Sequence, residues 1–426
     1  MDSFNLAYKR DEEESKWLEL LKAFNDIHQN DRTFVDKFGL LQKKQFTLNL
    51  FDILQTEIKE TKRSNVAILQ TLIALRISLR EIPTDEESIV LQNLNLFIKF
   101  GNIGEDNKTT MYSDEIREEA LKSTINSIVK SQSIHNKFVN ELNGPVLITR
   151  ELKKGADDKV SMPIYKILIH CCTRVEVRAK VLGEGLLDHV ADQMEARTTG
   201  NFEASVILGD LFRLMFTSTM HLGPLDSGSH SDLKVTEADY ARLRRLFPTF
   251  KKIFTYHCNA THQMYSIKLA LVSTLLNTPK DLFDELVDEI QLTYFEQILA
   301  TQLESYDKPE APGDIIPILM LLSCIAENVP QTRDPLKAFT FPHELIKETD
   351  EPLSISVEAP KESVSQGISA RLIPLMTSSD IGLKHFSAEY FYNICDQDPN
   401  ELCRLTGYGN AAGLLVTKGL MALGGK

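Results

Sequence analysis

Three glycines near the C-terminus have a spacing that could serve nucleotide binding. Gly407, Gly409 and Gly413 resemble part of a dinucleotide fingerprint, in which glycines let the backbone approach a pyrophosphate. That chemistry requires a strand before the first glycine, whereas residues 386–395 carry the apolar spacing of a helix. The pattern therefore favours a structural turn over a nucleotide site.

The same glycines suit a sharp connection between two helices. Gly407 and Gly409 can adopt positive φ at no steric cost, and Gly413 would let a neighbouring element approach closely. An asparagine is a good N-cap, so we expect Asn410 to cap a helix that begins at Ala411.

Other patterns with chemical potential are incomplete. His343 and Glu344 begin a zinc-protease motif, but Lys347 occupies the position of the second histidine. The six cysteines include no C-x-x-C pair, so neither a zinc site nor a redox dithiol is indicated. The sequence predicts no catalytic residue, no cofactor and no metal.

Two arginines offer a different kind of chemistry. Arg76 and Arg80 lie four residues apart beside the apolar pair Leu75 and Leu79, which places both guanidinium groups on one side of a helix. From a groove they could bind a carboxylate or the last carbonyls of a helix. A solvated helix face is the alternative.

The elements that would position these residues are helices. Apolar residues recur at helical spacing, as in Ile68, Leu72, Leu75 and Leu79, and strict alternation is scarce. An apolar ladder interrupted by a polar residue occurs around Asn126 and, in degenerate form, about two forty-odd-residue repeats later. We therefore predict an all-α fold, an armadillo/HEAT-like right-handed superhelical solenoid.

Composition limits the partners of the chain. Its 426 residues carry a net charge of −13, which disfavours nucleic acid because phosphate binding needs a basic face. The longest apolar run, residues 315–326, is too short to span a bilayer, and no signal region begins the chain. We expect a cytoplasmic protein whose acidity keeps it soluble or steers it toward a basic partner.

The region around the glycine turn resembles the signature of the synembryn family. The similar stretches are residues 371–377, 388–391, 406–415 and 418–421. The resemblance runs from about residue 61 to the end of the chain and is strongest after residue 364. It implies a repeat array over residues 61–400, preceded by N-terminal helices in residues 1–60 and followed by the signature turn and helix in residues 401–426.

The resemblance also implies a function. Synembryns are non-receptor guanine nucleotide exchange factors and folding chaperones for heterotrimeric G-protein α subunits (Gα). They bind GDP-bound Gα, release GDP and hold the nucleotide-free protein, with the C-terminal helix of Gα docked in the solenoid groove. They continue into an acidic segment, so we expect a chain that stops at Lys426 to be truncated or shortened.

Partner-binding residues are carried over position by position. At Arg213 the family more often has asparagine, so no groove role is carried over to that position. The resemblance allows a neuronal calcium sensor as a second partner and recruitment to the plasma-membrane cortex. An armadillo-type adaptor that binds an extended peptide without exchange activity is the alternative. The predicted partner-binding residues are Arg76, Arg80, Asn126, Arg371, Lys384, Tyr408 and Asn410.

Overall fold

The chain folds into helices wherever its structure is described. The structure is a computed structural model, and it describes residues 1–9, 14–31, 39–60, 64–104, 112–200, 206–223, 233–304, 311–346 and 367–420. No strand occurs within these ranges, which confirms the predicted all-α class. The chain divides into two compact units, Met1–Val190 (unit 1) and Ala191–Lys426 (unit 2). The expected boundaries at residues 60 and 400 concern the repeats and stay a prediction.

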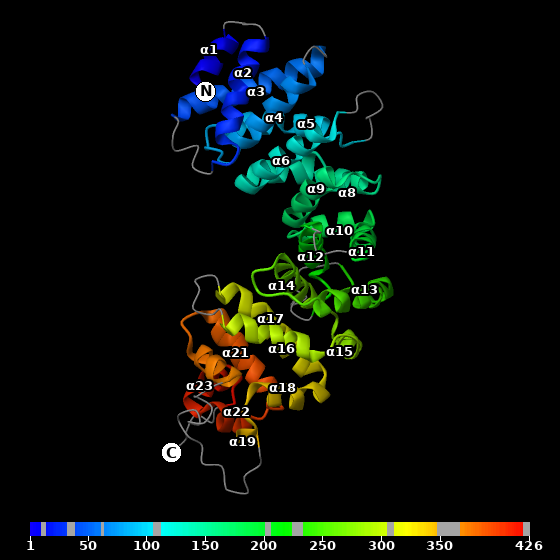
Figure 1. Ribbon diagram of the computed structural model, residues 1–426, viewed down its shortest axis with the longest axis vertical. Coiled ribbons are helices and arrows are strands. Elements are labelled where there is room, and N and C mark those ends of the chain that lie inside the picture. Colours follow the sequence, from blue (N-terminus) through cyan, green and yellow to red (C-terminus); the bar gives the residue numbers. More distant parts are fainter. Residues whose placement is uncertain are drawn as a thin grey trace. The chain divides into compact units, whose positions relative to one another are not determined.

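Unit 1 has two layers of helices (Figure 1). One layer is a stack in which each helix packs on the next, in the order α2, α4, α6 and α9. The other layer contains α3, α5, α7, α8 and α10, with η2 between α7 and α8. The helices are α1 Asp2–Lys9, α2 Glu14–His28, α3 Leu40–Glu60, α4 Asn65–Ser78, α5 Glu87–Phe100, α6 Asp114–Lys130, α7 Gln132–Asn136, the π-helical η2 Lys137–Glu141, α8 Gly144–Leu152, α9 Asp158–Cys171, α10 Val175–Gly183 and α11 Leu186–Arg197, which crosses the boundary between the units.

Unit 2 repeats this plan. Its stack runs in the order α12, α14, α17 and α21, and α13, α15 and α18 belong to the second layer. We call the stacked helices of both units the ladder helices. The helices of unit 2 are α12 Val206–Thr219, α13 Glu237–Thr255, α14 Gln263–Leu275, η3 Lys280–Leu282, α15 Phe283–Glu289, α16 Leu292–Glu304, α17 Ala311–Asn328, η4 Pro330–Thr332, α18 Arg333–Thr340, α19 His343–Ile346, α20 Ile368–Leu372, η6 Ile373–Thr377, α21 Ile381–Ile394, α22 Pro399–Thr406 and α23 Tyr408–Thr417.

The predicted apolar stripe of α4 forms part of the core of unit 1. Ile68, Leu72, Leu75 and Leu79 are fully buried, and each such side chain contributes about 1.5–3 kcal/mol relative to an exposed one. The start of α4 is fixed by Ser64, whose hydroxyl accepts a hydrogen bond from the backbone N–H of Ala67. The stripe and the cap together explain why this segment forms a ladder helix.

Asparagine side chains join neighbouring ladder helices. The Nδ2 atom of Asn126 in α6 donates to the carbonyl oxygen of Arg76 in α4, at 2.8 Å. In unit 2, Asn277 donates to the carbonyl of Phe216 at 2.7 Å, and Asn393 donates to that of Ser323 at 3.2 Å. These bonds satisfy carbonyls between the stacked helices, as expected for a repeat array.

A buried ion pair fixes the N-terminal part of unit 1. Lys43 Nζ lies 2.7 Å from Glu86 Oε2, and both side chains are almost fully shielded from solvent. Thr47 donates to the same carboxylate, and its hydroxyl also pairs with that of Ser78. Burying two charges is tolerated only when they pair and hydrogen-bond in this way, so the pair ties α3 to the turn before α5.

Candidate partner-binding site

The first predicted cluster lies between α4 and α6. Arg76 Nε donates to Glu119 Oε2 at 2.5 Å, and Lys122 Nζ lies 3.0 Å from the other oxygen of the same carboxylate. Asn126 donates to the backbone of Arg76. The structure therefore brings Arg76 and Asn126 together, and it pairs the guanidinium of Arg76 with a carboxylate of the chain itself.

Arg80 occupies a different environment from Arg76. Its Nη1 atom donates to the carbonyl oxygens of His28 at 2.9 Å and Asp31 at 2.6 Å, and its Nη2 atom donates to that of Gln29. These carbonyls lie at the C-terminal end of α2, where a cation opposes the negative end of the helix dipole. Arg80 thus binds helix-end carbonyls of its own chain, and a direct contact with a partner stays a prediction.

Two predicted basic residues lie near the end of unit 2. Arg371 is exposed on α20, and Lys384 is exposed on α21. Lys384 lines a hollow of about 230 Å³ between α21 and α23, with Ile381 and Leu414 among the apolar residues there. Gly413 of α23 faces it: a Cβ at this glycine would lie 3.6 Å from Lys384 Cε, an ordinary contact. The hollow can accept an apolar group beside a cation.

The glycine turn differs in detail from the prediction. Gly407 has φ of 81°, as expected, and it connects α22 to α23. The helix begins at Tyr408, so Gly409 lies inside it and Asn410 is not its N-cap. Instead, Asn410 Nδ2 donates to the carbonyl oxygen of Thr406 at 2.8 Å. The side chain reaches back to the end of α22 because Gly407 alone makes the turn, and so the N-cap prediction for Asn410 is wrong.

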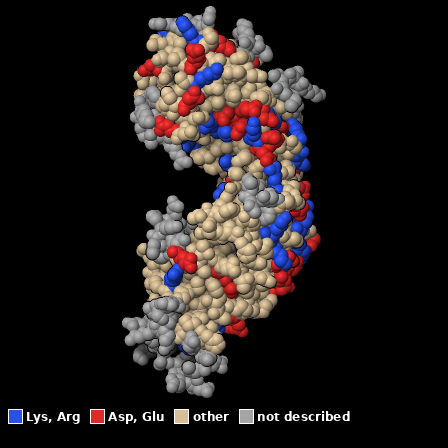
Figure 2. Space-filling model, in the orientation of Figure 1, with Lys and Arg blue, Asp and Glu red and all other residues tan. Residues whose placement is uncertain are grey.

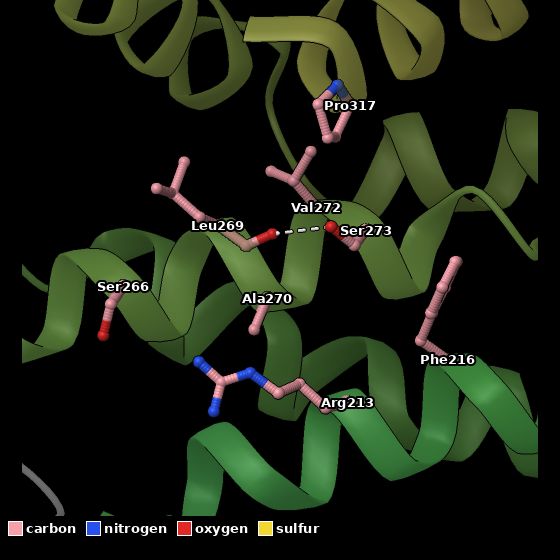
Figure 3. Close-up of a pocket in the computed structure, with 8 residues that line it drawn as sticks. All are labelled: Arg213, Phe216, Ser266, Leu269, Ala270, Val272, Ser273 and Pro317. Atoms are coloured by element: carbon pink, nitrogen blue, oxygen red, sulfur yellow. Dashed lines mark hydrogen bonds between the residues drawn. The ribbon is translucent and has the colours of Figure 1, made fainter. Parts of the chain in front are cut away.

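A cavity that the sequence did not reveal lies in unit 2. It has a volume of about 310 Å³ and is lined by residues of three ladder helices, α12, α14 and α17 (Figure 3). Phe216, Leu269, Val272 and Pro317 supply apolar walls, and Arg213 of α12 supplies a guanidinium group. In the sequence, Arg213 is the polar residue of the degenerate apolar ladder, at a position where similar proteins more often have asparagine. No local signal in the sequence marks the cavity, because its lining residues come from three separate helices.

The helices around this cavity carry few charges. The 13 residues of α14 include one charged side chain, Lys268, which is buried and donates to the carbonyls of Phe254 and Tyr256. Figure 2 shows the face over α14, α17 and α21 as mostly uncharged. In a chain that is 25% charged, such a face is suited to contact with another apolar surface.

The cysteines are unsuited to nucleophilic chemistry. Burial raises the pKa of the Cys172 thiol to about 12 and that of Cys324 to about 11, and it also raises the pKa of Cys171 and Cys395. Within the described ranges, no group of three or more His, Cys, Asp or Glu side chains is placed to hold a metal ion. In the same part of the chain, every helix is too short or too polar to cross a membrane.

The sequence of this chain is similar to those of known proteins. A sequence model of the family described as guanine nucleotide exchange factor synembryn matches residues 61–425. The Mus musculus protein named Chaperone Ric-8B is 21% identical over 459 residues, an alignment that covers 95% of this chain and 85% of that protein. Gallus gallus Chaperone Ric-8A is 37% identical over 110 residues, which cover 26% of this chain and 18% of the chicken protein.

A solved structure supports the fold alone. The crystal structure of an engineered protein is 12% identical to this chain, with a TM-score of 0.52. The match covers 99% of this chain and 95% of the engineered one. The fold is therefore shared with a protein whose sequence has little in common with this one.

Proposed function

This chain belongs to the synembryn family, and from that premise we propose that it is a non-receptor guanine nucleotide exchange factor and folding chaperone for heterotrimeric G-protein α subunits. It would bind GDP-bound Gα, promote GDP release and hold the nucleotide-free protein. No covalent step is required of the chain, because exchange is a change of affinities rather than of bonds.

The observation that carries this proposal is the charge-poor ladder face of unit 2. The cavity between α12, α14 and α17 accepts an apolar side chain, and the neighbouring surface of α14 lacks exposed charge. An amphipathic helix docks on such a surface through apolar residues that recur every three to four positions. The C-terminal helix of Gα is the segment we propose to bind there.

The predicted polar residues of unit 2 would orient the bound helix. Arg371 and Lys384 are exposed and can approach acidic groups of Gα. Tyr408 and Asn410 belong to α23, which packs against α21, the helix that carries Lys384, and a contact with Gα is proposed for both. In unit 1, Arg76 can exchange its bond to Glu119 for a carboxylate of the partner, while Asn126 holds the backbone of Arg76 in place.

Exchange follows if the helix is bound more tightly once GDP has left. Withdrawing the helix from its packing in Gα loosens the nucleotide site that it supports. Coupling is reciprocal, so the factor by which the chain weakens GDP equals the factor by which GDP weakens the chain. A 10⁴-fold effect needs about 5.5 kcal/mol of differential binding, which a few well-packed anchor residues can supply.

The test is GDP release from purified Gα, followed with a fluorescent GDP analogue. The wild-type chain should accelerate release, and Ala270→Phe should abolish the acceleration because the ring fills the cavity. The matched control is Ala241→Phe, which adds the same ring at an exposed position of α13. Equal activity of Ala270→Phe and the wild-type chain would exclude the cavity from the function.

An adaptor role is the alternative, and the same assay separates it. An armadillo-type adaptor would bind the Gα C-terminal peptide in a pull-down without changing the rate of GDP release. The chaperone role is measured separately, as the yield of folded Gα in cell-free translation with and without the chain. A neuronal calcium sensor as partner and a cytoplasmic or cortical location stay predictions.

A further inference from the structure

Arg213 presents hydrogen-bond donors at the mouth of the cavity. Its side chain is 58% exposed, and Nη1 lies 3.1 Å from Asp210 Oδ1, one turn earlier in α12. In Figure 3 the guanidinium extends beneath α14, toward Ser266 and Ala270. Among the described residues, no other hydrogen bond is made by the Arg213 side chain. A guanidinium has five N–H donors, so most of its binding capacity remains.

The other polar groups of the cavity are occupied by their own helix. Ser273 Oγ donates to the carbonyl oxygen of Leu269 at 3.2 Å, and Ser266 Oγ donates to that of Gln263 at 2.8 Å. The hydroxyl protons therefore point into the helix backbone. Arg213 is the one charged side chain that lines the cavity in the described part of the chain. A ligand group that complements it is a hydrogen-bond acceptor, and a carboxylate forms the strongest such bond because it is charged and can accept two N–H groups at once.

The volume argues for a side chain rather than a free metabolite. Pockets that bury cofactors and drug-sized ligands range from about 300 to 1,000 Å³, and this cavity lies at the lower limit of that range. Its apolar walls suit one large apolar side chain. On a helix, an apolar residue and an acidic residue three or four positions apart lie on the same face, which matches an apolar cavity with a cation at its mouth.

We propose that the cavity binds an apolar side chain of a docked helix and that Arg213 binds the carboxylate of an Asp or Glu three or four residues away on that helix. Asp210 positions the guanidinium for this contact and leaves the outer donors to the partner. The inference rests on the proposed helix docking and makes Arg213 a residue that selects among partner helices.

The experiment begins with a displayed library of alanine-rich helical dodecapeptides, selected on the full chain. Bound peptides should contain Asp or Glu three or four positions from Leu, Ile or Phe. Arg213→Gln should abolish this acidic preference. The matched control is Arg245→Gln, which removes an exposed arginine of α13 that forms ion pairs with Asp192 and Glu195. Circular dichroism checks that all variants stay helical.

A double-mutant cycle then measures the contact by fluorescence anisotropy. Changing the acidic residue of a selected peptide to its amide should weaken binding to the wild-type chain about ten- to a hundredfold, the range for a hydrogen bond to a charged group. The same change should have little effect on Arg213→Gln. Arg213→Glu should prefer a peptide with Lys in place of the acid.

The outcomes separate this inference from the proposed function. The inference would be overturned if the selected peptides showed no preference for an acidic residue, or if no peptide were selected. It would also be overturned if changing the acidic residue to its amide weakened binding to the wild-type chain and to Arg213→Gln equally. Accelerated GDP release together with such a result would leave the proposed function intact. Acidic selection that depends on Arg213, without any effect on GDP release, would support the inference and reject the proposed function.

Discussion

Arg80 offers the sharpest test of whether a basic residue on a ladder helix serves folding or binding. Its guanidinium donates to three carbonyls at the end of α2. Arg80→Met keeps most of the apolar stem but removes all three bonds. A hydrogen bond to a charged group contributes about 1.5–3 kcal/mol, and part of this is regained when water reaches the freed carbonyls. We expect a loss of about 2–4 kcal/mol.

Arg76→Met is the matched control, since it lies on the same helix one turn earlier. It loses its ion pair with Glu119, and Glu119 keeps its contact with Lys122. Its cost should be about 1 kcal/mol or less, as for most ion pairs near the surface. The two substitutions are therefore alike in chemistry and different in the number of bonds that they remove.

The assay combines urea unfolding with amide hydrogen exchange. Because the chain has two compact units, a single unfolding midpoint can conceal a local effect. Exchange should therefore rise specifically in residues 14–31 of Arg80→Met and stay near the wild-type level in Arg76→Met. If Arg80→Met keeps its stability and its protection in α2 but loses capture of a Gα C-terminal peptide, Arg80 is a contact residue and the structural reasoning is refuted.

Three further outcomes are expected. Lys43→Met should cost about 3–5 kcal/mol in urea unfolding because it leaves Glu86 charged and buried, whereas adding Glu86→Leu should recover most of the loss. Burial lowers the pKa of His135 from 6.5 to about 4, so the folded chain binds this proton more weakly than the unfolded chain. The weaker protonation of His135 in the folded chain has no effect on stability above about pH 6.5, and it destabilises the fold by about 1–3 kcal/mol as the pH falls to 4. His135→Gln should remove that part of the pH dependence of the free energy of unfolding. If Arg76 binds a carboxylate of Gα, Glu119→Gln should strengthen peptide binding in anisotropy measurements severalfold, and unchanged affinity would argue against that contact.

The fold could be predicted from the sequence because its signals are local. Apolar spacing identified α4, and Gly407 marked the turn between α22 and α23 by its freedom to adopt positive φ. The position of Asn410 was misjudged by one helical turn, because whether a helix starts at residue 408 or 411 depends on its packing against α22. Local sequence rules therefore predict which segments form helices, but they do not determine the residues at which those helices begin and end.

The role of each cation could not be predicted, because it depends on which helix ends nearby in space. Arg80 and Lys268 have the appearance of surface or groove residues in sequence, yet each binds carbonyls at the C-terminal end of another helix. The same arrangement recurs in both units. The described cations that also donate to carbonyls near a helix end include Arg117, Lys153, Arg178, Lys252, Arg333 and Arg404. A count of basic residues thus overstates how many can reach a partner.

The cavity was missed for a related reason. Its walls come from α12, α14 and α17, and the lining residues of one helix are separated from those of the next by more than forty positions in the chain. No sequence window contains them together, and no motif marks an unfilled volume between helices. The sequence shows Arg213 as the polar residue of a degenerate ladder, but its position beside an apolar cavity is visible only in the structure.

The asparagine bonds have a mechanical consequence. Each one connects a helix only to its immediate neighbour in the stack, as Asn393 connects α21 to α17. Damage at one joint, such as loss of the Asn277 amide, should therefore loosen two adjacent helices and leave the remainder of that unit assembled. A pair of adjacent helices can consequently separate locally while the other helices of the same stack keep their contacts with one another.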